Sequence, residues 1–163
     1  MAEFVPNVTR PIRPYAAEHF PGVFHHPETS VRTVAVERTF WEKATILHQE
    51  AHRPADKPLP SRYSRHYYDL FKLGESQFRK TALTQKELLN AVVKFKKKFY
   101  HSAWAKFEDA KPGTFKLLPS AAHKKDLQKD YKAMEAMLFG EAPPFEDLLE
   151  SLKELEQEIN NVS

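Results

Sequence analysis

Apolar residues from position 37 onward recur with the spacing of amphipathic helices. Phe40, Ala44, Leu47 and Ala51 occur at i, i+4, i+7 and i+11, which places them on one face and predicts a helix over residues 37–52. Pro54 is expected to end this helix, because proline cannot continue it. The same spacing predicts two helices near the C-terminus, with apolar positions Leu127, Tyr131, Met134 and Leu138, then Leu148, Leu152, Leu155 and Ile159.

Two further helices are predicted in the middle of the chain. One runs from Ser64 to Leu73, where Gly74 is expected to stop it. The other opens at Thr84-Gln85-Lys86-Glu87, whose hydroxyl and carboxylate have the spacing of a capping box. Its buried face is predicted to carry Leu88, Val92, Phe95 and Phe99.

The first 36 residues have a different pattern. Residues 1–30 contain five prolines and are expected to be extended or turn, whereas Val31-Arg32-Thr33-Val34-Ala35-Val36 is rich in β-branched residues and predicts a strand. No second convincing strand is evident, so a partner strand is expected outside this sequence or in another molecule. The fold class predicted is therefore mainly α with one short orphan β-strand. Two regions are expected, residues 1–53 (strand 31–36 and helix 37–52) and a helical region 62–163.

Composition narrows the chemistry that the chain could perform. The 163 residues include no Cys, which excludes disulfides, a thiol nucleophile and Cys-ligated metals. With only four Gly, the chain has no glycine-rich phosphate loop. No apolar run approaches the roughly 18 residues of a membrane span, and the N-terminus lacks the features of a signal peptide. A soluble, cytoplasmic protein is expected.

Charge is distributed unevenly along the chain. Residues 54–116 contain 14 Lys and Arg against 6 Asp and Glu, whereas residues 117–163 contain 5 against 10. A basic middle could attract nucleic acid or nucleotide phosphates. Alternatively, the acidic end could fold back over the basic middle, and charge alone does not separate the two interpretations.

Two charged positions are candidates for a site. On a helical wheel Lys43 lies at the edge of the buried stripe, where packing of its stem would hold the ammonium for a phosphate; the alternative is an ion pair with Glu50, two turns along. Asp69 shares a helix face with Arg65, which could position this carboxylate as a base or metal ligand. The alternative is a simple i, i+4 ion pair between Arg65 and Asp69.

Two weaker constellations remain. His48 and His52 are spaced i, i+4 and His66 could complete a zinc site, but the acidic residue of the zincin motif is displaced by one position to Glu50. Lys94, Lys97 and Lys98 form a basic face that could contact an RNA backbone, or could simply be solvated. Phe95 and Phe99 fall on the predicted core stripe, so they are expected to be buried rather than to stack on bases.

Several of these segments together resemble the AbiEii/AbiGii-type toxins, the nucleotidyltransferases of type IV toxin–antitoxin (abortive infection) systems. The resemblance rests on Glu37-Arg38-Thr39-Phe40-Trp41-Glu42-Lys43-Ala44-Thr45-Ile46-Leu47-His48 and Ser64-Arg65-His66-Tyr67-Tyr68-Asp69-Leu70. It continues through Ser102-Ala103-Trp104-Ala105-Lys106-Phe107 and Ala110-Lys111-Pro112-Gly113-Thr114.

The resemblance implies a DNA polymerase β-like nucleotidyltransferase fold. It also implies that Lys43 contacts nucleotide phosphates and that Asp69, oriented by Arg65, completes the site. His66 stands where the family often has Asp, and Glu50 stands where it tends to have Arg. The implied reaction transfers a nucleotide from a nucleoside triphosphate to an acceptor such as RNA.

One part of the family pattern is missing. Members carry a Gly-Gly or Gly-Ser turn and an Asp-x-Asp or Asp-x-Glu strand whose carboxylates bind magnesium, and residues 1–36 contain neither. The chain is therefore expected to correspond to the C-terminal part of such a toxin, to bind no magnesium tightly alone, and to need the metal-binding half for catalysis. The alternative is a non-catalytic helical module that binds an antitoxin or RNA.

Overall fold

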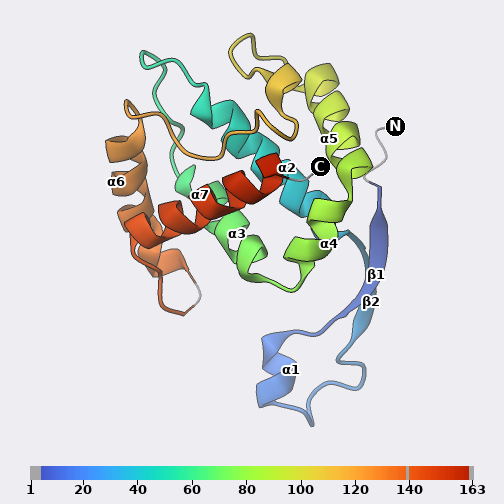
Figure 1. The fold of residues 1–163 in the computed structure, drawn as a ribbon. Helices are drawn as coiled ribbons and strands as arrows, with labels where there is room; N and C mark the ends of the chain where they lie inside the picture. The colour runs from blue at the N-terminus through green and yellow to red at the C-terminus, as the bar shows by residue number, and fades with distance from the viewer. Residues whose placement is uncertain (1–4, 139, 162–163) are drawn as a thin grey trace.

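The computed structural model describes residues 5–138 and 140–161 and shows a helical body with a projecting β arm (Figure 1). The body contains α2 (Val36–Ala51), α3 (Ser64–Glu75), α4 (Phe78–Thr84), α5 (Lys86–Phe99), α6 (Lys124–Met134) and α7 (Phe145–Asn161). Short 3₁₀ turns occur at Phe107–Asp109 (η1) and Glu135–Met137 (η2). The prediction of a mainly α fold is confirmed. Within the described ranges, no helix combines the length and the apolar character that crossing a membrane requires.

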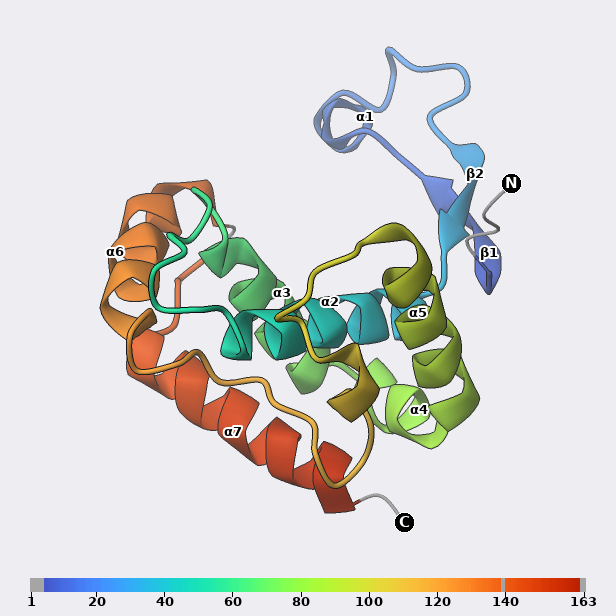
Figure 2. The ribbon, with the colours of Figure 1, turned by 90° about the horizontal axis from the view of Figure 1, so that it is seen from above.

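Helix α2 occupies the centre of the body and packs against α3, α4 and α5 (Figure 2). Its predicted stripe is buried at Phe40, Ala44 and Leu47, and Trp41 adds an indole N–H that donates to the carbonyl of Ala82 at 3.0 Å. Residues on both sides of the loop at 53–62 belong to this one hydrophobic core. A central helix of this kind can carry polar side chains on the part of its surface that the neighbours leave open.

Helix α3 extends two residues beyond Leu73, so the expected stop at Gly74 is wrong. Gly74 is buried inside the helix, and a Cβ atom there would lie 3.5 Å from Leu155 Cδ2 of α7. The small residue therefore marks a close approach of α3 and α7 rather than a helix end. The acidic C-terminal part does reach the basic middle, since Arg79 and Glu158 form an ion pair.

The buried stripe of α5 is shorter than the one predicted, because Val92 is buried and Leu88 partly buried but the stripe does not continue to Phe99. Leu89 and Val92 are buried, whereas Phe95 is only partly buried and Phe99 is 53% exposed. The predicted capping box is also absent, because Thr84 is the last residue of α4 and its hydroxyl donates to the carbonyl of Thr81. Helix α5 begins after Gln85, and its final turn extends beyond the core.

The prediction of an orphan strand is wrong. Strand β2 (Thr29–Val34) pairs antiparallel with β1 (Asn7–Ile12), in a register that sets Thr9 opposite Arg32. Pro11 lies within β1, which a two-stranded sheet tolerates because both strands are edges and the missing N–H can face solvent. With α1 (Tyr15–His19) between them, the strands form an arm that projects from the helical body (Figures 1 and 2).

Candidate functional site

Lys43 lies where α2 meets α3, at the edge of the buried face of α2. Its Nζ donates to Asp69 Oδ2 at 2.6 Å and contacts His66 Nδ1 at 3.2 Å. The lysine side chain is 21% exposed and the Asp69 side chain 40%. An ammonium has three N–H donors, so these two bonds leave one for a ligand. We call Lys43, His66 and Asp69 the open cluster.

A carboxylate from α6 fixes the start of α3 and with it the positions of His66 and Asp69. Asp130 Oδ1 accepts from the Arg62 backbone N–H at 2.6 Å, and Oδ2 accepts from the Ser64 N–H at 2.8 Å and from its hydroxyl at 2.6 Å. Burial acts to raise the pKa of Asp130, but these hydrogen bonds outweigh it and lower the pKa. Asp130 therefore satisfies N–H groups that the first turn of a helix leaves unpaired.

His66 is neutral at physiological pH. Burial lowers its pKa to about 4, and the neighbouring charges of Lys43 and Arg65 act in the same direction. Because Lys43 donates to Nδ1, the ring proton belongs on Nε2. His66 thus acts as an uncharged acceptor that steadies Lys43 without neutralising it.

A surface pocket of about 330 Å³ opens beside Asp69. Its cationic groups are Arg62 and Arg65, and the rest of its lining is largely apolar or aromatic: Tyr68, Met134, Met137 and Leu138. A pocket that combines guanidinium groups with an apolar wall suits a ligand that has both anionic and flat apolar parts.

The ion pairs differ from those expected from spacing. Asp69 pairs with Lys43 of the neighbouring helix, and the expected Arg65–Asp69 pair is not formed in the described structure. Arg65 lines the same pocket as Asp69 without bonding to it. The alternative Lys43–Glu50 pair is not formed either, because Glu50 pairs with Arg53.

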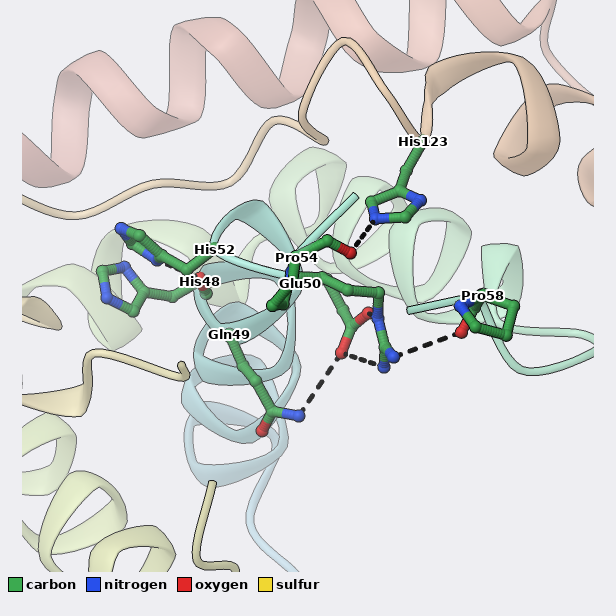
Figure 3. A network of polar contacts seen from close by, with 8 residues as sticks. His48, Gln49, Glu50, His52, Pro54, Pro58 and His123 are labelled. Carbon is green, nitrogen blue, oxygen red and sulfur yellow. Dashed lines mark hydrogen bonds and ion pairs between the residues drawn. The ribbon is translucent and has the colours of Figure 1, made fainter. Parts of the chain in front are cut away.

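A second set of interacting polar side chains lies at the C-terminal end of α2, and Figure 3 shows it from close by. Glu50 accepts from Arg53 Nη2 at 3.0 Å, and the Arg53 guanidinium also donates to the carbonyl of Pro58. His48 accepts from the Lys116 N–H through Nδ1, and its Nε2 lies 3.0 Å from the carbonyl of Lys106. We call His48, Glu50 and Arg53 the closed cluster, because their polar atoms bond to other groups of the chain.

These bonds do not assemble the zinc site considered for His48, His52 and His66. Both ring nitrogens of His48 have partners, and His52 Nδ1 lies 2.8 Å from the carbonyl of His48. Within residues 5–138 and 140–161, no group of three or more His, Asp or Glu side chains is placed to hold a metal ion.

The lysines near the end of α5 differ in their exposure to solvent. Lys94, Lys97 and Lys98 are exposed, as a face that contacts RNA would require. Lys96 is instead partly buried, and burial lowers its pKa, while the charge of Glu42 raises it and that of Lys43 lowers it. Lys96 therefore adds positive charge next to the open cluster.

The sequence analysis considered His66 only as a possible zinc ligand and as the position where the family often has Asp, and it gave no role in the site to Arg62, Met134 or Met137. His66 is one turn before Asp69 on the same helix face, which is a signal that spacing could have given. Arg62 and the methionines Met134 and Met137 come from a loop and from a distant part of the chain. Only the packing of α6 against α3 places the two methionines beside Asp69.

Comparison with known proteins gives one positive result. A search of curated proteins and a search of solved structures returned no significant match. A family description of the nucleotidyl transferase AbiEii toxin of type IV toxin–antitoxin systems matches residues 2–151, which is most of the chain. Lys43 and Asp69, which the packing of α2 on α3 brings into contact, both lie within this match. The chain belongs to the AbiEii family of nucleotidyl transferase toxins.

Proposed function

We propose that the open cluster and the adjoining pocket bind the phosphates and base of a nucleoside triphosphate for nucleotidyl transfer to an acceptor such as RNA. The observation that carries this proposal is the position of Lys43, which is held by Asp69 and His66 and retains a donor for a phosphate oxygen. Arg62 and Arg65 extend the positive charge across the pocket. The expected roles are phosphate contact for Lys43 and completion of the site for Asp69.

The pocket supports a nucleotide rather than a simple anion. Tyr68, Met134 and Leu138 give one part of it an apolar wall against which a flat base could pack. Arg62 and Arg65 could bind phosphate oxygens in a bidentate manner, which a lysine cannot do. The Asp69 carboxylate, between the pocket and Lys43, could accept a hydrogen bond from a sugar hydroxyl or from the base.

The described residues do not fit the magnesium that the family implies. Asp69 is the carboxylate of the open cluster, and it is paired with Lys43. Glu42, one position before Lys43, is paired with Arg38. Magnesium prefers several oxygen ligands, so the proposal assigns phosphate binding to the cationic side chains and includes no step through the metal.

Calorimetry with each of the four ribonucleoside triphosphates, with and without magnesium, tests the proposal. We expect saturable binding of at least one triphosphate and a loss of tenfold or more in affinity in Lys43→Ala. The matched control is Lys72→Ala, because Lys72 lies on α3 but pairs on the surface with Glu75. Equal binding by Lys43→Ala and wild type would contradict the assigned role of Lys43.

A non-catalytic role in binding an antitoxin is the second candidate. Large apolar side chains are exposed on the arm, as is common where a protein partner binds, and they are Val8, Ile12, Tyr15, Phe20 and Val23. The same calorimetry separates the two candidates. Binding of no triphosphate would overturn the catalytic proposal and leave the interaction role.

A further inference from the structure

The end of α5 exposes aromatic rings among lysines. Phe99 is 53% and Tyr100 55% exposed, and the partly buried Phe95 ring lies 4.8 Å from that of Phe99 and 6.1 Å from that of Tyr100. Lys98 Nζ lies 5.3 Å from the centre of the Phe99 ring, and Lys96 Nζ lies 5.0 Å from that of Tyr100. Aromatic rings in this setting can stack on bases while the ammonium groups bind phosphates.

The loop after α5 adds a pocket of about 370 Å³ next to these rings. Lys97, Lys106 and His101 line it, and Glu108 contributes the opposing charge. Ser102 also lines it, and its hydroxyl oxygen is buried with no hydrogen-bond partner in the described structure. The pocket thus offers a ligand the positive charges of Lys97 and Lys106 beside one carboxylate.

Lys96 relates this surface to the open cluster through its charge. Lys96 is one turn before Tyr100 and touches its ring, and its charge interacts with those of Glu42 and Lys43 on α2. A chain lying on Phe99 and Tyr100 could therefore reach Lys43 by passing Lys96.

We infer that the end of α5 and the following loop, residues 94–106, bind a single-stranded segment of RNA. If the proposed function holds, this segment leads the end of the acceptor to the open cluster. The lysines match the charge of a polyphosphate backbone, and the exposed rings need unstacked bases. A duplex fits less well, because its bases are stacked inside the helix and inaccessible to Phe99 and Tyr100.

Fluorescence anisotropy with a labelled 12-nucleotide single-stranded RNA and with a duplex of the same sequence tests this inference. We expect the single strand to bind more tightly than the duplex. The double variant Phe99→Ala/Tyr100→Ala should lose tenfold or more in affinity for the single strand, since stacking contributes about 1–3 kcal/mol per base. Phe20→Ala is the control, because Phe20 is a phenylalanine on the arm that is 62% exposed, somewhat more than Phe99.

Salt dependence provides an independent measurement. The double variant Lys97→Gln/Lys98→Gln should lower the slope of log K against log salt concentration by up to about 0.7 for each phosphate that the variant no longer neutralises. Lys124→Gln/Lys153→Gln, at exposed positions on α6 and α7, should leave the slope unchanged. Circular dichroism verifies that all variants are folded.

The outcomes separate this inference from the proposed function. Equal binding of single strand and duplex, or wild-type affinity in Phe99→Ala/Tyr100→Ala, would overturn the inference. Triphosphate binding without RNA binding would overturn it too, while leaving the proposed function intact. RNA binding that depends on the two rings, in a chain that binds no triphosphate, would support the RNA surface and remove the proposed function.

Discussion

The open and closed clusters are built around Lys43 and Glu50, which lie two turns apart on α2, and they differ in solvent exposure and in hydrogen bonding. In the closed cluster the side chain of Glu50 is 1% exposed and that of Arg53 is 10% exposed. The Trp104 ring covers the Arg53 guanidinium, whose Cζ atom lies 4.7 Å from the ring centre. In the open cluster Lys43 and Asp69 remain partly exposed beside a pocket. The polar side chains of the closed cluster form hydrogen bonds to other parts of the chain, whereas Lys43 in the open cluster retains an N–H donor for a ligand. Polar side chains on one helix can thus have structural and functional roles that helical spacing does not distinguish.

The largest expected effect of a substitution on stability is in the closed cluster. Glu50→Gln removes the charge partner of Arg53 and leaves a nearly buried guanidinium uncompensated, so we expect a loss of about 3 kcal/mol in the free energy of unfolding. Urea denaturation at pH 7 measures it. The control is Glu75→Gln, which breaks the exposed pair with Lys72 and should change stability by less than about 0.5 kcal/mol. A similar, small effect of both substitutions would remove the distinction between the clusters.

The closed cluster should also be sensitive to acid through His48. Burial lowers the pKa of His48 from 6.5 to about 4 in the folded chain, so between these values the unfolded chain binds the proton more strongly. The stabilisation is complete above pH 6.5 and is lost as the pH falls toward 4, with a total on the order of 3 kcal/mol.

A substitution isolates this contribution. His48→Gln lacks the titrating ring, so the difference in unfolding free energy between wild type and variant should narrow as the pH falls from 7 to 4. Urea denaturation at each pH measures the difference. Parallel profiles for the two proteins would show that His48 does not titrate as the burial of its ring implies.

The open cluster should contribute little to stability. Lys43→Ala and Asp69→Asn each break a partly exposed ion pair, so we expect changes of about 1 kcal/mol or less. A double-mutant cycle by urea denaturation measures their coupling, which should also stay below about 1 kcal/mol. A coupling above about 2 kcal/mol would make the open cluster a structural element like the closed one.

The smallest effect is expected at Arg65. Its guanidinium lines the pocket, and Asp69 is paired with Lys43 instead, so Arg65→Gln should change the free energy of unfolding by less than about 0.5 kcal/mol. Urea denaturation measures this change in the free energy of unfolding, with Lys43→Ala measured in parallel for comparison. A loss above about 1 kcal/mol would indicate that Arg65 stabilises Asp69 after all, as its i, i+4 spacing suggested.

The helical pattern predicted the part of the site that lies on one helix. The apolar stripe of α2 placed Lys43 at the edge of the core, and the structure shows its stem packed and its ammonium partly open. The partner was not predictable in this way. Asp69 is 26 residues away and reaches Lys43 only through the packing of α2 on α3, whereas spacing along the chain could show only Arg65.

Strand β1 and the exposure of Phe99 also differ from the sequence predictions, for physical reasons that residue spacing does not show. Strand β1 was missed because Pro11 argues against a strand, and the structure tolerates it only because both strands are edges. Phe99 was placed in the core because the period of a helix continues to its last residue. The core that covers α5 ends earlier, at the turn of Val92. Phe99 therefore lies on the same face of the helix as Val92 but is exposed to solvent.

The attachment of the arm to the body has a consequence for the timescale of amide hydrogen exchange. Hydrogen bonds fasten the arm where the Ala35 N–H donates to the carbonyl of Pro6 and where Arg38 donates to the carbonyl of Val5. A two-stranded sheet is marginal by itself, so the arm can open while the helical body stays intact. Its ladder amides, such as that of Arg10, which lies in a hydrogen-bonded pair with Val31, should exchange with deuterium well before the amide of Leu47 in the centre of α2. The chain would then unfold in two separable units, of which the smaller carries most of the exposed apolar side chains.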